Sequence, residues 1–221
     1  MPQPPAPHTV GVLLAAGAGR RMGRPKALVV GTDGEPWIVR GARVLLAGGC
    51  DEVLVVLGAS AAEARELLAT GGLGERVRAT DARRWAEGLS ASLAHGVAAA
   101  HEAGAEVALI SLVDLPDLTP DAVQRLLAGT GPATLAQAFY DGRPSHPVAI
   151  GRDHLLALRD ALTRPPASDR GARPYLVAHG AAEIDCTDLG GGTDVDRPTG
   201  PHPHRSLATG RNRPAPGLTP T

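Results

Sequence analysis

Short apolar runs alternate along the chain with longer segments whose apolar residues recur at helical spacing. Residues 10–15, Val-Gly-Val-Leu-Leu-Ala, form a continuous apolar run of strand length, which is typical of a strand that a parallel sheet buries on both faces. Further strands are expected at residues 53–57, 77–80, 107–113, 134–140 and 147–150. Helices are expected at residues 36–47, 61–69, 90–103, 121–127, 153–161 and 173–179. This alternation predicts an α/β protein with a three-layer, Rossmann-like architecture and a mostly parallel central sheet.

The two ends of the chain depart from this pattern. Residues 1–8 are rich in proline, and residues 199–221 combine Pro, Gly, Arg and Thr with few apolar side chains. Such segments bury too little apolar surface to offset the entropy lost when a chain becomes ordered. We therefore expect a single domain at residues 9–198 between two disordered ends.

Composition narrows the partners and the compartment. The 221 residues carry a formal net charge of −1, which is unlike the broad basic face of a general nucleic-acid binder. Cys50 and Cys186 lie far apart without the spacing of a metal site, and this usage fits a reducing compartment better than a disulfide framework. No apolar run reaches membrane-spanning length. We expect a cytoplasmic protein that binds neither nucleic acid nor membrane.

The most informative segment follows the first apolar run. Gly17, Gly19 and Gly23 permit positive φ and close approach of the backbone, so consecutive N–H groups can point at phosphate oxygens. The same loop carries four cations: Arg20, Arg21, Arg24 and Lys26. Because cations crowded on one short loop repel each other unless an anion neutralises them, the segment predicts a site for a nucleotide triphosphate.

Two other glycine-loop chemistries fit the segment less well. A Walker loop ends in Gly-Lys-Ser/Thr, whereas here Lys26 follows Pro25 and precedes Ala27. A dinucleotide fingerprint requires a helix that opens at the last glycine, and Pro25 disfavours helical backbone at Arg24. It also requires an acidic residue at the end of the second strand, but Asp33 lies in a turn-like Gly-Thr-Asp-Gly sequence. An extended loop that wraps a triphosphate, with Lys26 beyond it, is the interpretation that fits every residue.

A carboxylate after a second buried strand predicts a metal site. Asp114 follows the apolar run at 107–113, and ligands of open parallel sheets lie beyond the carboxyl ends of the strands. If strands 10–15 and 107–113 are neighbours, Asp114 lies beside the glycine loop and can share a Mg²⁺ ion with the phosphates. Capping of a turn or helix is the alternative role for Asp114, although Asp117 and Thr119 can provide that cap.

One long motif makes a resemblance specific. Residues 14–26 read Leu-Ala-Ala-Gly-Ala-Gly-Arg-Arg-Met-Gly-Arg-Pro-Lys. Further motifs follow in the same order at residues 33–34, 48–58, 85–93, 114–116, 146–147, 169–173 and 194–196. Over roughly residues 10–198 the chain thereby resembles the MobA-like nucleotidyltransferases, particularly the molybdenum cofactor cytidylyltransferases. The resemblance implies the nucleotidyltransferase (GT-A-like) form of the predicted fold.

The resemblance also implies an activity and its residues. The reaction is a Mg²⁺-dependent transfer of CMP from CTP to the phosphate of a molybdopterin-type acceptor, with release of pyrophosphate. Lys26, Asp114 and Arg20 take catalytic roles, and Asp114 and Asp196 bind the metal. The implied nucleotide-binding residues are Leu14, Ala15, Ala16, Gly17, Gly19, Arg20, Lys26, Thr80, Asp81 and Ser90. The implied acceptor-binding residues are His146, Arg170 and Arg173.

The identity of the nucleotide and that of the acceptor each have more than one interpretation. Ala15-Ala16-Gly17 resembles the cytidylyl members, whereas Ala-Gly-Gly is typical of guanylyl members. The Ala16 methyl group would narrow the base pocket in favour of the smaller pyrimidine. GTP is the alternative nucleotide, and a sugar or alcohol phosphate is the alternative acceptor. A non-catalytic carrier of a molybdenum cofactor is the alternative from another class of protein.

The resemblance also implies a partner protein, and the sequence departs from the family pattern at a few positions. A molybdenum hydroxylase is the implied recipient of the product. Ser145 and Val113 stand where relatives commonly carry glycine, and Arg197-Pro198 replaces the usual acidic helix after the late aspartate. Either Asp194 or Asp196 can be the second metal ligand.

Overall fold

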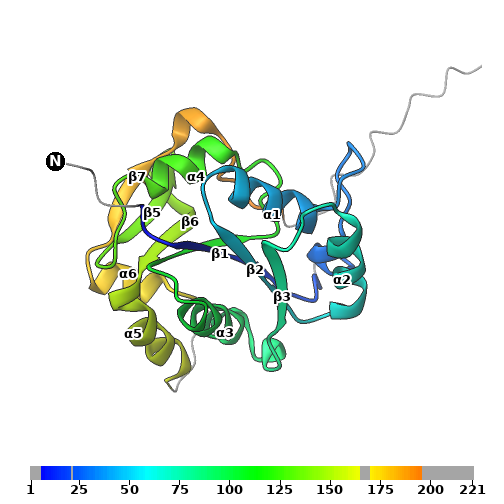
Figure 1. The fold of residues 1–221 in the computed structure, drawn as a ribbon, viewed down its shortest axis with the longest axis horizontal. Helices are drawn as coiled ribbons and strands as arrows, with labels where there is room; N and C mark the ends of the chain where they lie inside the picture. Colours follow the sequence, from blue (N-terminus) through cyan, green and yellow to red (C-terminus); the bar gives the residue numbers. More distant parts are fainter. Residues whose placement is uncertain (1–5, 21, 165–169, 196–221) are drawn as a thin grey trace, which may run out of the picture.

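A seven-stranded sheet forms the centre of the described chain, which in this computed structural model comprises residues 6–20, 22–164 and 170–195 (Figure 1). The strand order is β3-β2-β1-β4-β6-β5-β7. The strands are β1 Thr9–Ala15, β2 Glu52–Leu57, β3 Val77–Asp81, β4 Val107–Leu112, β5 Leu135–Tyr140, β6 Arg143–Gly151 and β7 Ala182–Asp185. β6 runs antiparallel to β4 and β5, and the other neighbouring pairs are parallel. The prediction of a mostly parallel sheet is confirmed.

Helices cover both faces of the sheet, so the domain has three layers (Figure 1). The α-helices are α1 Trp37–Ala47, α2 Ala61–Thr70, α3 Leu89–Glu102, α4 Pro120–Leu127, α5 Arg152–Thr163 and α6 Arg173–Ala178. Leu13 and Ala15 of β1 share one core with α1, α2 and α4. Val12 and Leu14 share the opposite core with α3, α5 and α6. Because successive strand residues point to opposite faces, one apolar run supplies both cores.

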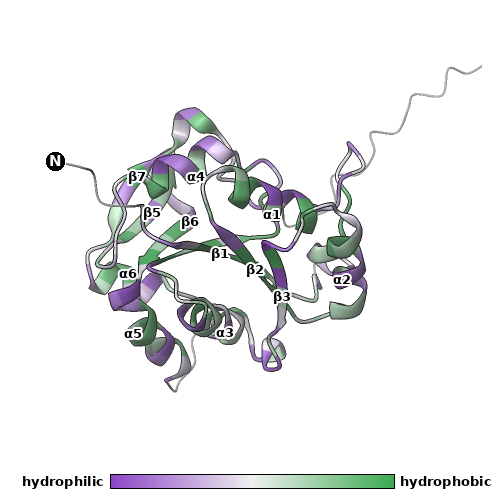
Figure 2. Cartoon of the chain, in the orientation of Figure 1, coloured by the Kyte–Doolittle hydropathy of each residue, from purple (hydrophilic) through white to green (hydrophobic). Residues whose placement is uncertain are grey.

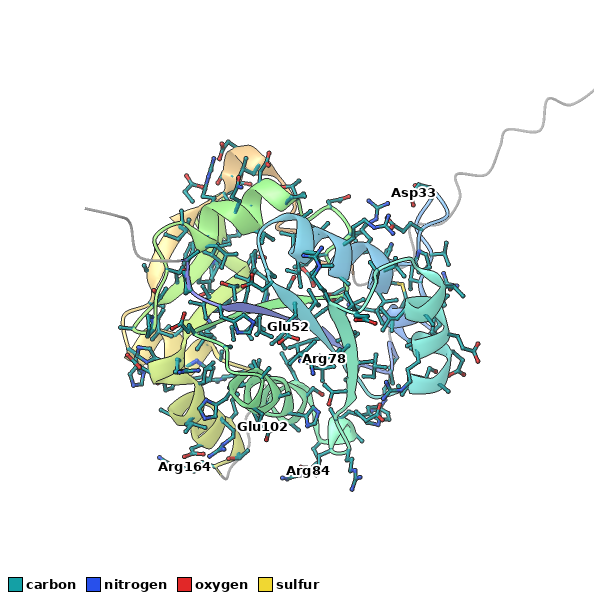
Figure 3. All side chains as sticks on the ribbon, viewed as in Figure 1. Asp33, Glu52, Arg78, Arg84, Glu102 and Arg164 are labelled. Atoms are coloured by element: carbon teal, nitrogen blue, oxygen red, sulfur yellow. The ribbon has the colours of Figure 1, made fainter. Side chains whose placement is uncertain are left out.

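Charged side chains lie along the edge strand β3 and on the surface of the domain. The edge strand β3 is only partly buried and carries hydrophilic residues (Figure 2). Arg78 of β3 and Glu52 of β2 form an ion pair at 2.5 Å, and Arg84 and Arg164 extend away from the ribbon (Figure 3). Charges of this kind on an edge strand disfavour pairing with a second chain.

Most predicted elements are present with boundaries shifted by one or two residues, and two differences are larger. β6 begins at Arg143 rather than at residue 147, because Asp141 and Gly142 have φ of 51° and 70° and close a two-residue hairpin with β5. β7 was not expected, since its four residues are mostly exposed. It forms by parallel pairing with β5.

Candidate active site

The glycine loop and Asp114 lie side by side at the carboxyl end of the sheet. β1 and β4 are adjacent parallel strands, with Leu14 opposite Leu112. The Val113 amide also donates a hydrogen bond of 3.1 Å to the Leu14 carbonyl oxygen. The strand order reverses between β1 and β4, and such switch points are where open α/β sheets bind ligands. The predicted adjacency of the two strands is confirmed.

The glycine loop, residues 16–25, has an irregular backbone in its described part and leads into the 3₁₀ helix η1 (Lys26–Leu28). Gly19 and Gly23 have φ of 60° and 76°, whereas Gly17 does not adopt a positive φ. A Cβ atom added to Gly19 would lie 1.8 Å from the Arg24 carbonyl oxygen. Met22 is buried in the core beneath the loop. The helix that a dinucleotide fingerprint needs at Gly23 is not formed.

Lys26 and Asp114 form an ion pair at this junction. The Lys26 Nζ atom donates to the Asp114 Oδ2 atom at 2.5 Å. Both side chains are largely enclosed, with 18% and 13% of their surfaces exposed. Solvent therefore screens this pair less than an ordinary surface ion pair.

A cavity of about 520 Å³, here named the glycine-loop cavity, opens at the ion pair. Its lining includes many of the expected nucleotide-binding residues: Leu14, Ala16, Gly17, Gly19, Arg20 and Lys26, together with Asp114. Ala15 instead points into the core on the α1 face of the sheet. The loop, the cations and the carboxylate are thus brought together around one space.

Three other expected nucleotide-binding residues lie outside the lining of this cavity. The Thr80 hydroxyl group is 2.8 Å from the ring of His95. Asp81 forms an exposed ion pair of 2.7 Å with Arg65. Ser90 is buried in the first turn of α3. The structure therefore places none of these three residues on the lining of the glycine-loop cavity.

The junction between the 3₁₀ helix η2 (Trp85–Glu87) and α3 supplies lining that the sequence reasoning did not assign. The added lining residues are Trp85, Ala86, Glu87, Gly88, Leu89 and Ser92. Gly58, after β2, lets the Trp85 ring pack closely, because a Cβ atom at Gly58 would lie 2.6 Å from the Trp85 Cγ atom. The motif at residues 85–93 was the sequence signal that could have pointed to these lining residues. Only the fold shows which of its side chains reach the cavity.

A second cavity of about 300 Å³, here named the His146 cavity, adjoins the first. The two share Leu14, Leu89 and Leu112 in their linings. The expected acceptor residues His146, Arg170 and Arg173 line the His146 cavity together with Asp194. Apolar side chains form much of the remaining wall, including Leu93, Ile110, Leu115, Val148 and Leu176.

His146 connects the two carboxylates electrostatically. Burial lowers the pKa of His146 to about 4, while the negative charges of Asp114 and Asp194 act in the opposite direction. The imidazole ring is therefore uncharged at neutral pH and can donate or accept hydrogen bonds. Asp114 and Asp194, which are far apart in the sequence, both act on this one ring.

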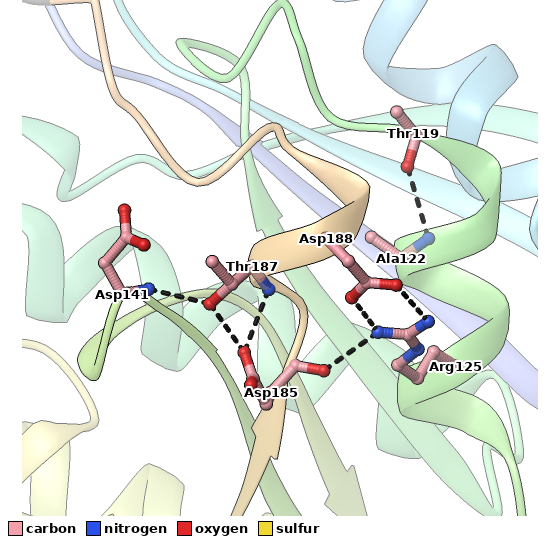
Figure 4. Close-up of polar contacts among 7 residues, drawn as sticks. All are labelled: Thr119, Ala122, Arg125, Asp141, Asp185, Thr187 and Asp188. Carbon is pink, nitrogen blue, oxygen red and sulfur yellow. Dashed lines mark hydrogen bonds and ion pairs between the residues drawn. The ribbon is translucent and has the colours of Figure 1, made fainter.

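The C-terminal segment, residues 187–195, holds Asp194 at the site. Its 3₁₀ helix η3 (Thr187–Leu189) is fixed to α4 by paired hydrogen bonds between Arg125 and Asp188 (Figure 4). The Ser145 hydroxyl group donates to the Gly192 carbonyl oxygen at 2.8 Å. The Val195 amide donates to the Asp114 carbonyl oxygen at 3.0 Å. The expected metal ligand Asp196, like Arg21 and Asp169, lies outside the described residues.

None of the described helices combines the length and apolar character needed to cross a bilayer. No three His, Cys, Asp or Glu side chains in the described ranges converge as a metal-binding group.

Comparisons with known proteins identify the family. Residues 11–183 match the model of the MobA-like NTP transferase domain. A relative named nicotine blue oxidoreductase, from Paenarthrobacter nicotinovorans, is 38% identical over 86% of this chain and 93% of its own length. A probable molybdenum cofactor guanylyltransferase from Mycobacterium ulcerans is 32% identical over 69% of this chain and 72% of its own. A solved nucleotidyl transferase from Methanothermobacter has a TM-score of 0.67 at 25% identity, covering 86% of this chain and 92% of its own.

The chain belongs to the MobA-like NTP transferase family, and it is a nucleotidyltransferase. The predicted family and fold are both confirmed. The relatives include proteins named as molybdenum cofactor guanylyltransferases.

Proposed function

We propose that the protein transfers CMP from CTP to the phosphate of a molybdopterin-type acceptor and releases pyrophosphate. The observation that carries the proposal is the 2.5 Å contact between Lys26 and Asp114 on the lining of the glycine-loop cavity. The Lys26 ammonium group can bind a phosphate, and the Asp114 carboxylate can bind a divalent cation. A phosphate chain and a divalent cation are the two parts of a metal-bound nucleotide triphosphate.

The transfer needs alignment and charge neutralisation more than covalent catalysis. An oxygen of the acceptor phosphate attacks the α-phosphorus of CTP, the new P–O bond forms, and the bond to the bridging oxygen of the β-phosphate breaks. The electron pair leaves with pyrophosphate, so no covalent enzyme intermediate is required. Lys26 and Arg20, both on the cavity lining, neutralise the negative charge that moves toward pyrophosphate.

The donor set fits Mg²⁺, the cofactor we propose. Asp114 offers hard carboxylate oxygens, and Asp194 adjoins Val195, whose amide donates to the Asp114 carbonyl oxygen at 3.0 Å. Mg²⁺ is commonly held by one or two carboxylates plus substrate phosphates and water. Asp196 is the other candidate for the second ligand. The ion, when bound, would stabilise negative charge on the phosphoryl oxygens.

The choice of CTP depends on Ala16, which belongs to the lining of the glycine-loop cavity. A glycine at this position would leave room for a larger base. Trp85 lines the same cavity and offers an aromatic face for stacking. GTP is the competing nucleotide, because several relatives are named guanylyltransferases.

The acceptor is proposed to occupy the His146 cavity. Arg170 and Arg173 line it and can hold a phosphate monoester through forked N–H groups. The apolar wall suits a flat ring system, and the uncharged His146 ring offers hydrogen bonds. Because the two cavities share Leu14, Leu89 and Leu112, an acceptor phosphate can approach the α-phosphate of the nucleotide directly.

The proposal is tested by incubating the purified protein with each NTP, Mg²⁺ and molybdopterin while pyrophosphate release is measured. CTP should give the highest rate, and Asp114→Ala should lower it by ~10²-fold or more because charge stabilisation is lost. Asp117→Ala is the matched control, since Asp117 is on the same loop but lines neither cavity. No pyrophosphate with any nucleotide would overturn the transfer to this acceptor. Tight pterin binding without turnover would favour the carrier alternative.

A second candidate function is reduction with a nicotinamide cofactor, favoured by the 38% identity to the relative named nicotine blue oxidoreductase. The strand end that would hold the ribose of such a cofactor argues against it. β2 ends at Leu57 and is followed by Gly58 and Ala59, so no carboxylate stands at this strand end. Fluorescence titration with NADH and NADPH separates the two functions, since the nucleotidyltransferase should bind neither tightly.

A further inference from the structure

Lys26 and Asp114 contact each other although the proposed function gives each a different ligand. The pair is enclosed, with 18% and 13% of the two side chains exposed. A ligand that reaches only one member has to separate the two groups. The other member then loses a 2.5 Å contact with an opposite charge while most of its side chain stays enclosed, which is unfavourable.

The two ligands together remove this difficulty. A divalent cation against Asp114 replaces the charge of the Lys26 ammonium group, and a triphosphate against Lys26 replaces the charge of the carboxylate. Each member of the pair then exchanges one counter-charge for another. The electrostatic cost of opening the pair is therefore shared between two binding events rather than falling on either one.

We infer that the Lys26–Asp114 ion pair makes the binding of divalent cation and of triphosphate interdependent, so that the protein disfavours either ligand alone and accepts the metal–nucleotide complex. This inference rests on the proposed function, because it takes the glycine-loop cavity as the triphosphate site. It goes beyond that function by giving the pair a role in the protein before substrate arrives. The pair weakens the binding of free metal and of metal-free nucleotide to the site.

Arg20 provides an internal comparison. It lines the same cavity as Lys26, and it forms no ion pair with any other residue that the structure describes. Its replacement should weaken triphosphate binding without releasing the Asp114 carboxylate. The effect of the ion pair can thus be separated from the effect of positive charge in the cavity.

The test measures each ligand by itself, because metal and nucleotide also associate in solution. Mn²⁺ is the metal probe, followed by electron paramagnetic resonance, and CTP with EDTA is the metal-free nucleotide, followed by calorimetry. Lys26→Met should bind Mn²⁺ alone about 5-fold or more tighter than wild type, since the carboxylate has lost its competing cation. Asp114→Asn should bind metal-free CTP more tightly by a similar factor, although it loses affinity for Mg²⁺–CTP.

Control variants separate the effect of the Lys26–Asp114 ion pair from the effect of positive charge anywhere in the cavity. Arg20→Ala should leave Mn²⁺ affinity within about twofold of wild type, and thermal melting should show that all variants are folded. The inference is wrong if neither Lys26→Met nor Asp114→Asn gains affinity, or if Arg20→Ala gains as much Mn²⁺ affinity as Lys26→Met. Absence of CTP binding to the wild type in the presence of Mg²⁺ would instead overturn the proposed function.

Discussion

At the scale of single residues, Gly19 has the narrowest tolerance for substitution in the glycine loop. Its φ of 60° disfavours other L-residues, and its Cα lies where an added Cβ atom would overlap the Arg24 carbonyl oxygen. The loop can fold back on itself only at a residue without a side chain. Arg20 lies within the loop that this close approach closes, and Lys26 follows the loop.

Gly19→Ala should weaken nucleotide binding in a protein that stays folded. The methyl group forces the backbone around Arg24 to move, and a strained loop residue costs about 1–3 kcal/mol, equivalent to roughly tenfold or more in affinity. The dissociation constant of Mg²⁺–CTP measured by calorimetry checks this. Gly34→Ala is the matched control, because Gly34 has a φ of 86° but open space at the Cβ position. Equal effects of the two variants would contradict the steric explanation.

At the scale of elements, the C-terminal segment joins three parts of the fold at the site. Gly191 and Gly192 fit against residues 117–118 and the Tyr140 ring so closely that a Cβ atom at either glycine would overlap its neighbour. Ser145 of β6 donates its hydrogen bond to this segment. A glycine-rich sequence that suggests flexibility is thus a closely packed connection, which leads directly to Asp194.

Ser145→Ala should loosen this segment and impair the acceptor more than the nucleotide. Loss of one hydrogen bond costs about 0.5–1.5 kcal/mol, which corresponds to roughly a 2–10-fold rise in the KM for the acceptor. The KM for CTP should change little, since Ser145 lines the His146 cavity and not the glycine-loop cavity. Steady-state kinetics with each substrate varied in turn measures both constants.

Two further variants test whether the effect of Ser145→Ala comes from the loss of its hydroxyl group. Ser145→Thr keeps the hydroxyl group and should restore most of the acceptor KM. Thr163→Ala removes a hydroxyl group that donates to the Arg159 carbonyl oxygen at the end of α5, and it should leave both constants unchanged. A parallel rise in both KM values for Ser145→Ala would indicate general loosening of the domain instead.

At the scale of the whole molecule, His146 links the site to stability. It lies on β6, where the carboxylates of Asp114 and Asp194 both act on its ring, and burial lowers its pKa from 6.5 to about 4. In the unfolded chain the ring takes up a proton as the pH falls below about 6.5, whereas the folded protein resists protonation until about pH 4. The unfolded state therefore binds more protons in this window, and the free energy of unfolding decreases as the pH falls through it.

His146→Gln should remove this part of the pH dependence. A shift of this size corresponds to on the order of 3 kcal/mol across the window, because one pKa unit is equivalent to about 1.4 kcal/mol. Urea unfolding at pH 7.5 and pH 4.5 measures the free energy of unfolding of wild type and variant. The wild type should lose more stability than the variant, while the carboxylates common to both contribute equally. The same loss in both proteins would contradict the link to His146.

Local sequence determined the helices and strands, and it determined the chemistry of the residues that follow β1 and β4. The apolar run that became β1 is almost fully buried because it serves two cores, and the glycines and Pro25 exclude a helix from the described part of the loop. The order of the strands could also be anticipated for β1 and β4, since a shared ligand requires their ends to meet. These features depend on spacing and backbone preference, which act over a few residues.

Only the tertiary structure decided which distant side chains share a cavity. It directs Thr80 and Asp81 to His95 and Arg65, lines the glycine-loop cavity with Trp85 and its neighbours, and adds β7 to the edge of the sheet. It also pairs Lys26 with Asp114, 88 residues apart in the chain. Such contacts depend on how whole layers pack and which strand edges remain open. Periodicity carries no information about either, because it describes a residue's own element and not the neighbours of that element.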